Sequence, residues 1–136
     1  MSVNVKGVWS WLPHIVPAMT AAKAGQIVVT SSVLGMQTMP GYGAYCASKF
    51  AVQGLIGALR GELDGTGVKA ATVNPAAVAT PWWSEPERGG KSGAVPDFPK
   101  LTPEDVAEAI VSILRQAPTC DIDHVILKPG VPAKDA

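Results

Sequence analysis

The stretch IVVTSSVLGMQTMPGYGAYCASKFAVQGL, from Ile27 to Leu55, decides the fold. Its β-branched start predicts a buried strand over Gln26 to Ser31, of the kind found in parallel sheets. A connection rich in glycine and proline follows, which is typical of a loop. The next residues predict a helix that carries Tyr45 and Lys49 on one face, because residues four apart on a helix are neighbours.

A lysine beside a tyrosine changes what the phenol can do chemically. An undisturbed phenol titrates near pH ~10, and lowering its pKa to about 7 takes roughly 4 kcal/mol. One cation about 4 Å away, at an effective dielectric constant of about 20, supplies roughly that much. We therefore expect Lys49 to lower the pKa of Tyr45. Ser32, at the carboxyl end of the predicted strand, is expected to join them, since ligands bind at that edge of open α/β sheets.

These residues resemble the short-chain dehydrogenase/reductase family. The likeness lies in Ser-Ser-x-x-Gly at Ser31 to Gly35, in Tyr-x-x-x-Lys at Tyr45 to Lys49, and in the thirteen-residue step from Ser32 to Tyr45. Upstream, Asn4-Val-Lys-Gly7 is similar to the family's Asn-x-x-Gly. The resemblance implies a catalytic tetrad of Asn4, Ser32, Tyr45 and Lys49.

Each of these residues also has a purely structural explanation. Asn4 could satisfy backbone groups at the start of a helix. Tyr45 and Lys49 could be an exposed helix pair, and Ser32 an ordinary turn serine.

The spacing of apolar residues in the rest of the chain predicts further helices and strands, in an order that fits the same family. Helices are expected over Met1 to Lys23, Ala44 to Asp64 and Thr102 to Gln116, and further strands over Val68 to Val73 and His124 to Leu127. Gly25 is expected to end the first helix in a left-handed conformation. The resemblance implies an α/β fold, a partial Rossmann-like doubly wound parallel sheet of about three strands with flanking helices. It covers residues 1–136 as a single domain and only the second half of the family's fold, so the N-terminal dinucleotide-binding half is absent.

The resemblance also implies a cofactor, NAD or NADP. Tyr45, Lys49, Pro75, Val78 and Thr80 match the family's cofactor-binding positions. Ala76 stands where the family has glycine, and would be strained by about 1 kcal/mol if that position requires positive φ. The family's Gly-x-x-x-Gly-x-Gly turn and the residue that chooses NAD or NADP do not occur before Asn4.

Substrate contacts are expected from Ser32, Tyr42 and Trp82. Residues from Pro81 to Leu101 show no clear periodicity, and in the family the matching region folds over the substrate. Packing explains Tyr42 equally well, and it explains Trp82 or Trp83 at least as well.

Net charge, apolar runs and cysteine spacing exclude several classes of protein. Eleven basic and eleven acidic residues give zero net charge, which offers no electrostatic case for binding nucleic acid or an anionic membrane. No apolar run is long enough for a bilayer span, and Cys46 and Cys120 lack metal-ligand spacing. We expect a soluble protein of the reducing cytoplasm with no metal site.

By resemblance the chain is an NAD(P)-dependent oxidoreductase that interconverts a small-molecule alcohol and a carbonyl by hydride transfer. The alternative is a truncated, catalytically incompetent remnant that retains only self-association. A homo-oligomer is expected through the helices Met1 to Lys23 and Ala44 to Asp64. The second helix carries several small residues, which are Ala47, Ala51, Gly54, Gly57, Ala58 and Gly61. Helical glycine costs up to about 1 kcal/mol, so close approach of another backbone, from a partner or from the chain's own sheet, would explain them.

Overall fold

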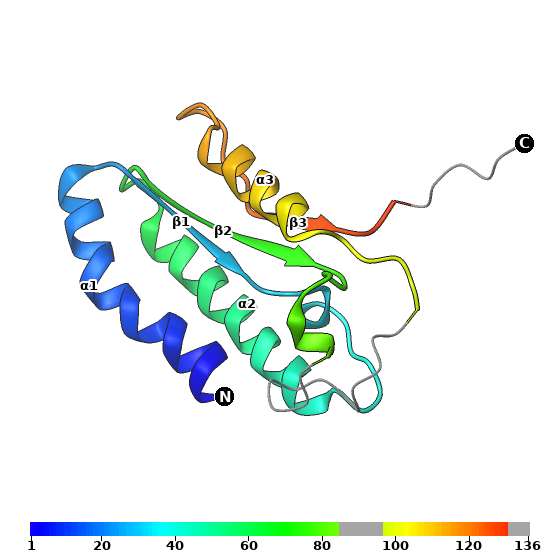
Figure 1. The fold of residues 1–136 in the computed structure, drawn as a ribbon. Helices are drawn as coiled ribbons and strands as arrows, with labels where there is room; N and C mark the ends of the chain where they lie inside the picture. The colour runs from blue at the N-terminus through cyan, green and yellow to red at the C-terminus, as the bar shows by residue number, and fades with distance from the viewer. Residues whose placement is uncertain (85–96, 131–136) are drawn as a thin grey trace, which may run out of the picture.

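A computed structural model describes residues 1–84 and 97–130 of the chain (Figure 1). In order, its elements are η1 (Ser2–Lys6), α1 (Gly7–Ala22), β1 (Gly25–Thr30), η2 (Val33–Gly35), α2 (Gly43–Leu63), β2 (Val68–Pro75), η3 (Pro81–Trp83), α3 (Pro103–Leu114) and β3 (His124–Leu127). Every helix and strand predicted from the sequence is present, with bounds that differ by a few residues.

The described strands form one parallel sheet in the order β1-β2-β3. Gly25 lies opposite Val68 at the start of the β1–β2 pair, and Pro75 lies opposite Leu127 at the end of the β2–β3 pair. Helices α1 and α2 cover one face of the sheet, and α3 covers the other (Figure 1). The expected α/β fold with three parallel strands is confirmed.

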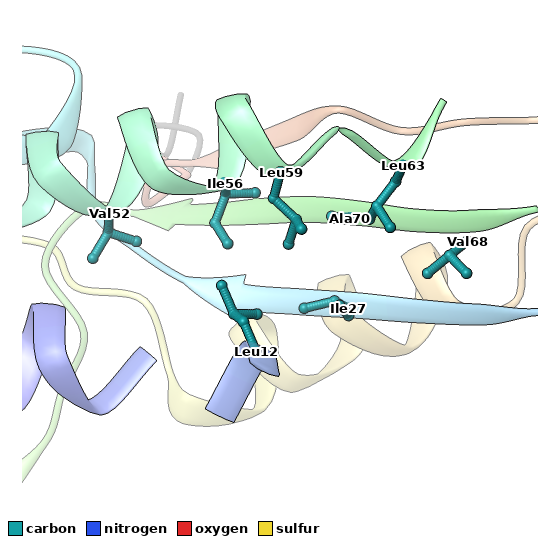
Figure 2. Packing of buried hydrophobic residues seen from close by; sticks show 8 residues of the cluster. All are labelled: Leu12, Ile27, Val52, Ile56, Leu59, Leu63, Val68 and Ala70. Atoms are coloured by element: carbon teal, nitrogen blue, oxygen red, sulfur yellow. The ribbon is translucent and has the colours of Figure 1, made fainter. Parts of the chain in front are cut away.

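The larger core cluster lies between the sheet and the α1–α2 face. Leu12 of α1 and Ile27 of β1 meet the apolar stripe of α2, whose members include Val52 and Ile56, each 1% exposed (Figure 2). On the opposite face, Ile113 of α3 packs against β2. Because both faces of the sheet are covered, its strands read as continuous apolar runs rather than as alternating ones.

The turn between α1 and β1 differs from the expectation. The left-handed residue is Lys23, with φ of 52°, and Gly25 already belongs to β1. A Cβ at Gly67 would collide with the carbonyl of Lys23, and Gly67 itself has φ of 82°. The tight approach of the two loops at this end of the sheet therefore falls on Gly67 rather than on Gly25.

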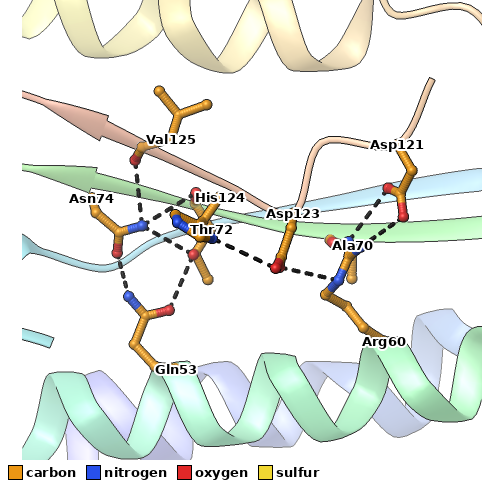
Figure 3. Close-up of polar contacts among 9 residues, drawn as sticks. All are labelled: Gln53, Arg60, Ala70, Thr72, Asn74, Asp121, Asp123, His124 and Val125. Carbon is orange, nitrogen blue, oxygen red and sulfur yellow. Dashed lines mark hydrogen bonds and ion pairs between the residues drawn. The ribbon is translucent and has the colours of Figure 1, made fainter. Parts of the chain in front are cut away.

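Polar side chains tie α2 to the sheet (Figure 3). The Arg60 guanidinium forms ion pairs with Asp121 at 2.6 Å and with Asp123 at 3.1 Å, and it also donates to the carbonyl of Ala70. These contacts fix the end of α2 against β2 and the segment that enters β3.

The chain after β2 crosses to the start of α3. Val78 forms a parallel bridge with Leu101, and the indole Nε1 of Trp83 donates to the Val78 carbonyl at 2.6 Å. Part of the irregular segment expected over Pro81 to Leu101 lies outside the described residues. Within residues 1–84 and 97–130, no helix is both long enough and apolar enough to cross a membrane.

Candidate active site

Ser32 lies immediately beyond the carboxyl end of β1. The Ser31 amide still donates to Val73 of β2 at 2.8 Å, and the chain then turns into η2. The Ser32 hydroxyl accepts a hydrogen bond from the amide of Leu34 at 3.1 Å, which fixes its rotamer, and the residue is 7% exposed. The strand end therefore presents a hydroxyl whose position is set by the turn that follows.

Helix α2 brings Tyr45 and Lys49 to the same place. The Lys49 Nζ lies 5.7 Å from the centre of the Tyr45 ring and donates to the carbonyl of Thr30 at 3.2 Å. A Cβ at Gly35 would be 2.9 Å from the carbonyl oxygen of Lys49, so η2 touches the backbone of α2 there. Glycine at position 35 is what allows the serine loop and the Tyr-Lys helix to meet.

The electrostatics of the pair differ from the expectation. Burial raises the pKa of the Tyr45 phenol above its ordinary value, and the hydrogen bond with Ser32 only partly offsets that rise. Burial also lowers the pKa of Lys49. The expected lowering of the Tyr45 pKa by Lys49 is therefore not what the structure gives, because desolvation of the phenol is the largest cause of its shift.

Asn4 reaches the site through a residue that the sequence did not single out. It lies in the π-helical turn η1, and its Nδ2 donates to the Ser48 hydroxyl at 3.0 Å. Ser48, which is 2% exposed, in turn donates to the carbonyl of Tyr45 at 2.7 Å. The structure thus brings Ser32, Tyr45 and Lys49 together, with Asn4 one hydrogen bond away from the helix that carries two of them.

The predicted cofactor segment follows the end of β2. Pro75 is buried, Val78 is half-buried in its bridge to Leu101, and Thr80 is exposed. Among the described residues Lys23 is the only non-glycine residue with positive φ, so Ala76 carries no strain of the kind considered from the sequence. The replacement of glycine by alanine is compatible with this loop.

The two aromatic candidates for substrate contact belong to different elements. Tyr42 precedes α2 by one residue, one turn before Tyr45. Trp82 packs edge-on against Trp83, with ring centres 4.7 Å apart, and Trp83 packs on Phe98 at 5.5 Å. Trp83 anchors this aromatic group to the Val78 carbonyl, and Trp82 and Phe98 pack on either side of it.

A buried amide network behind the site was also missed from the sequence. Asn74 is fully buried, and its Nδ2 donates to the Thr72 hydroxyl at 3.1 Å and to the Val125 carbonyl at 3.3 Å (Figure 3). Gln53, one turn beyond Lys49 on α2, donates to Asn74 and accepts from Thr72 at 3.0 Å. The only sequence signal was an amide next to a proline at the end of an apolar strand.

Three glycines have the spacing of the family's phosphate-binding turn, but they lie between a helix and a strand. Gly61, Gly65 and Gly67 follow Gly-x-x-x-Gly-x-Gly, but they end α2 and precede β2. This turn lies at the amino end of the strands, opposite Ser32 and Tyr45. It is not a phosphate loop that follows a strand and opens a helix.

Comparison with known proteins places this arrangement in a family. The model of the family described as short chain dehydrogenase matches residues 1–89. Glycine betaine reductase ATRR of Emericella nidulans is 36% identical over 95% of this chain and 10% of its own length. An uncharacterized oxidoreductase of Staphylococcus saprophyticus is 30% identical over 95% of this chain and 52% of its own. The closed form of serine dehydrogenase complexed with NADP+ is 25% identical, with a TM-score of 0.84 over 98% of this chain and 56% of that chain.

The matches cover nearly all of this chain but only part of each relative. This chain is matched nearly from end to end, yet it spans only about half the length of the Staphylococcus oxidoreductase and of the serine dehydrogenase. What those whole proteins do therefore involves residues that have no counterpart in this chain.

Proposed function

Because this chain belongs to the short chain dehydrogenase family, we propose that it carries the catalytic half of an NAD(P)-dependent oxidoreductase that interconverts an alcohol and a carbonyl. The observation that carries this proposal is the meeting of Ser32, Tyr45 and Lys49 at the carboxyl end of β1. A hydroxyl, a phenol and an ammonium in one place can bind a carbonyl oxygen and transfer a proton to it.

In this proposal the roles follow from the chemistry of each group. Ser32 holds the substrate oxygen, and Tyr45 gives or takes its proton. Burial raises the pKa of the Tyr45 phenol, so the phenol stays in the protonated form that a donor needs, but it is a weaker acid than a phenol whose pKa lies near the working pH. Asn4, through Ser48, positions the helix that carries Tyr45 and Lys49, and it would lie on the proton path to Lys49.

The described residues fit the nicotinamide end of the cofactor. The Lys49 ammonium can hold the nicotinamide ribose, and Pro75, Val78 and Thr80 form a segment pinned by the bridge to Leu101. When bound, NAD or NADP supplies the hydride acceptor or donor. Among the described residues, the Gly-x-x-x-Gly-x-Gly spacing does not occur between a strand and the helix that follows it, so this part of the chain offers no such loop for the pyrophosphate. The two free cysteines suit a reducing compartment such as the cytoplasm.

A small-molecule alcohol or carbonyl is the proposed substrate, with Ser32 as its polar anchor and Tyr42 and Trp82 as apolar contacts. Turnover of such compounds by the purified chain, with NAD(H) and NADP(H), tests the proposal directly. Tyr45→Phe is expected to lower the rate by about 100-fold or more, the usual contribution of a general acid or base. A wild-type rate in Tyr45→Phe would refute the assignment of Tyr45.

Cofactor binding is tested separately from turnover. Titration with NADP+ and NAD+, followed by fluorescence of the four tryptophans, is expected to show weaker binding for Lys49→Met. Lys6→Met, which removes an exposed lysine of η1, is the matched control and should bind as the wild type does. Equal affinity of both variants would remove Lys49 from the cofactor site.

The second candidate is a remnant that has lost catalysis and retains self-association. It is favoured by the outer surface of α1 and α2. Trp9 is 59% exposed and Phe50 is 42% exposed, and nothing lies within 4 Å of a Cβ built at Gly54 or Gly57. The chain's own sheet therefore does not explain the α2 glycines, and we propose that a second copy packs on this face.

Sedimentation equilibrium tests this oligomer. Ala58→Arg places a charge in the groove that Trp9, Leu12 and Leu55 also line, and it is expected to shift the chain toward the monomer. Ala107→Arg, at an exposed alanine of α3, is the control and should leave the assembly unchanged. A folded dimer that binds neither NAD+ nor NADP+ would favour the remnant over the enzyme.

A further inference from the structure

Three side chains form a closed ring of hydrogen bonds between α2 and β2 (Figure 3). Gln53 donates through Nε2 to the Oδ1 atom of Asn74, and it accepts through Oε1 from the Thr72 hydroxyl at 3.0 Å. The Asn74 Nδ2 atom donates to the same hydroxyl at 3.1 Å and completes the ring. Each member both donates and accepts within the ring, so each amide has its orientation set by the other two groups.

The ring takes the place of apolar packing at one end of the interface between α2 and β2. Alternate residues of β2 face α2, and the first two of them, Val68 and Ala70, belong to the apolar core there. Thr72 and Asn74 continue the same row and are 3% and 0% exposed. An apolar residue at position 53 would leave two buried polar groups without these partners, which is unfavourable. Position 53 is therefore specified by its partners on β2.

The ring joins the two segments that the proposed function places around the nicotinamide. On α2, Gln53 follows Lys49 by four residues, a rise of about 6 Å along the helix. On β2, Asn74 directly precedes the predicted cofactor segment, Pro75 to Thr80. The Asn74 Nδ2 atom also donates to the Val125 carbonyl at 3.3 Å, so the ring is anchored to β3 as well. A movement of α2 along β2 would break the ring, and the ring therefore holds Lys49 in register with this segment.

Arg60 offers a comparison, because it also ties α2 to the sheet. Its guanidinium donates to the Ala70 carbonyl and pairs with Asp121 at 2.6 Å. Arg60 lies seven residues beyond Gln53, which is about two helical turns, and Ala70 is in the first half of β2. Loss of Arg60 thus removes a polar tie of the same two elements at the end away from the cofactor segment.

We propose that Gln53 is a positioning residue, which acts through its ring with Thr72 and Asn74. It holds the Pro75–Thr80 segment at a fixed distance from Lys49 and so sets the width of the nicotinamide site. The inference rests on the proposed function, which assigns both segments to the cofactor. It adds that affinity for the nicotinamide end depends on a side chain whose amide is bonded within the protein.

The first test needs no ligand. Native-state hydrogen exchange, followed by NMR, measures how often the Ala76 and Ala79 amides open from the backbone carbonyls that they bond. Gln53→Met keeps an unbranched side chain of similar length and removes both bonds of the Gln53 amide. It is expected to raise exchange at these two amides by about fivefold or more, the net worth of about one hydrogen bond. Arg60→Met, the matched control, should change their exchange by less than about twofold, because amides at strand ends exchange through local opening.

The second test measures binding of nicotinamide mononucleotide, which has the nicotinamide ribose and one phosphate but no adenylate half. Fluorescence of the four tryptophans follows the titration. Gln53→Met and Thr72→Val are each expected to raise Kd by about fivefold or more. The double variant should be no weaker than Gln53→Met alone, because either change opens the same ring. Thr72→Ser keeps the hydroxyl and should bind as the wild type does, and so should Arg60→Met.

The Thr72 variants keep the proposal testable if Gln53→Met does not fold. Circular dichroism shows which variants are folded. Thr72→Val removes only the hydroxyl, and Thr72→Ser restores it, so this pair carries the same comparison in both measurements. Equal binding and equal exchange in Thr72→Val and Thr72→Ser would overturn the proposal.

The outcomes separate this inference from the proposed function. No binding by the wild type, or equal binding by the wild type and Lys49→Met, would overturn the proposed function, and the exchange measurement then still supports or refutes the link from Gln53 to the segment. Wild-type binding that Gln53→Met leaves unchanged would overturn the inference alone. Equal effects of Gln53→Met and Arg60→Met would also overturn it, because both residues would then act only through overall stability.

Discussion

Gly35 lies against the backbone of Lys49, so that a Cβ at position 35 would be 2.9 Å from the Lys49 carbonyl oxygen and 2.9 Å from the Ser31 hydroxyl. This contact joins the serine loop to the helix that carries Tyr45. It therefore controls both the stability of this corner of the fold and the distance between the candidate catalytic groups.

Gly35→Ala is expected to destabilise the chain by about 1–3 kcal/mol, because an overpacked site must move backbone atoms. Urea denaturation measures the loss. Gly57→Ala, measured on the monomer, is the control, since within one chain a Cβ there meets nothing within 4 Å, and it should stabilise the helix by up to about 1 kcal/mol. Equal effects of the two alanines would mean that the contact at Gly35 is not tight in solution.

The hydrogen bond from Asn4 to Ser48 should be measurable as a coupling energy. Asn4→Ala and Ser48→Ala each remove one partner, and the double variant completes a cycle. We expect a coupling of about 1 kcal/mol, the usual net value of such a bond. Ser48→Ala alone should cost more than Asn4→Ala, because Ser48 is buried and also bonds the Tyr45 carbonyl. A coupling of zero would separate η1 from the helix of the site.

Much of the fold follows from local sequence patterns. The short β-branched runs before Ser31 and before Asn74, each preceded by glycine, predict buried strands. Thr102 with Asp105 marks the start of α3 by a capping box. Tyr45 and Lys49 face one way because helical spacing alone requires it. These features need no knowledge of distant residues.

Other features depend on residues that only the fold brings together. Lys23 rather than Gly25 is left-handed because Gly67, from another loop, packs on the Lys23 carbonyl. The role of Ser48 depends on Asn4, forty-four residues away in the sequence. The direction of the Tyr45 pKa shift depends on how deeply α2 is covered, which spacing does not reveal.

The Tyr45 phenol should titrate above its ordinary value of 10.0, since burial raises its pKa. The phenolate absorbance of the wild type minus that of Tyr45→Phe isolates this group. Ser32→Ala should raise the pKa further, because a hydrogen bond to the phenolate lowers it. A Tyr45 pKa below 10.0 would show that Lys49 dominates after all.

The same shift has a consequence for stability. With a folded pKa above the unfolded one, the unfolded chain releases its proton first, so stability falls as pH rises from about 10 toward the folded value. Tyr45→Phe should lose less stability than the wild type over that alkaline range. Lys49 acts in the opposite sense, because its pKa is lowered by burial. Thermal melts of Tyr45→Phe and of Lys49→Met against pH separate the two contributions.

Asn74→Asp tests the buried network behind the site. The Asn74 amide nitrogen donates to the Thr72 hydroxyl and to the Val125 carbonyl. In Asn74→Asp the carboxylate oxygen that replaces this nitrogen would face those two oxygens without a proton to donate, while the other oxygen still accepts from Gln53. We expect a loss of about 3 kcal/mol or more at neutral pH, as for an uncompensated buried charge.

The loss should depend on pH with a definite sign. The buried carboxyl has a folded pKa above the unfolded value of about 3.9, so the stability that the variant keeps is fully present below that pH and falls as pH rises through the folded pKa. Gln37→Glu, at an exposed amide, is the control and should change stability by less than about 0.5 kcal/mol at any pH. A pH-independent loss in Asn74→Asp would show that water reaches Asn74, because only a solvated carboxylate keeps its ordinary pKa and avoids the desolvation that couples its charge to folding.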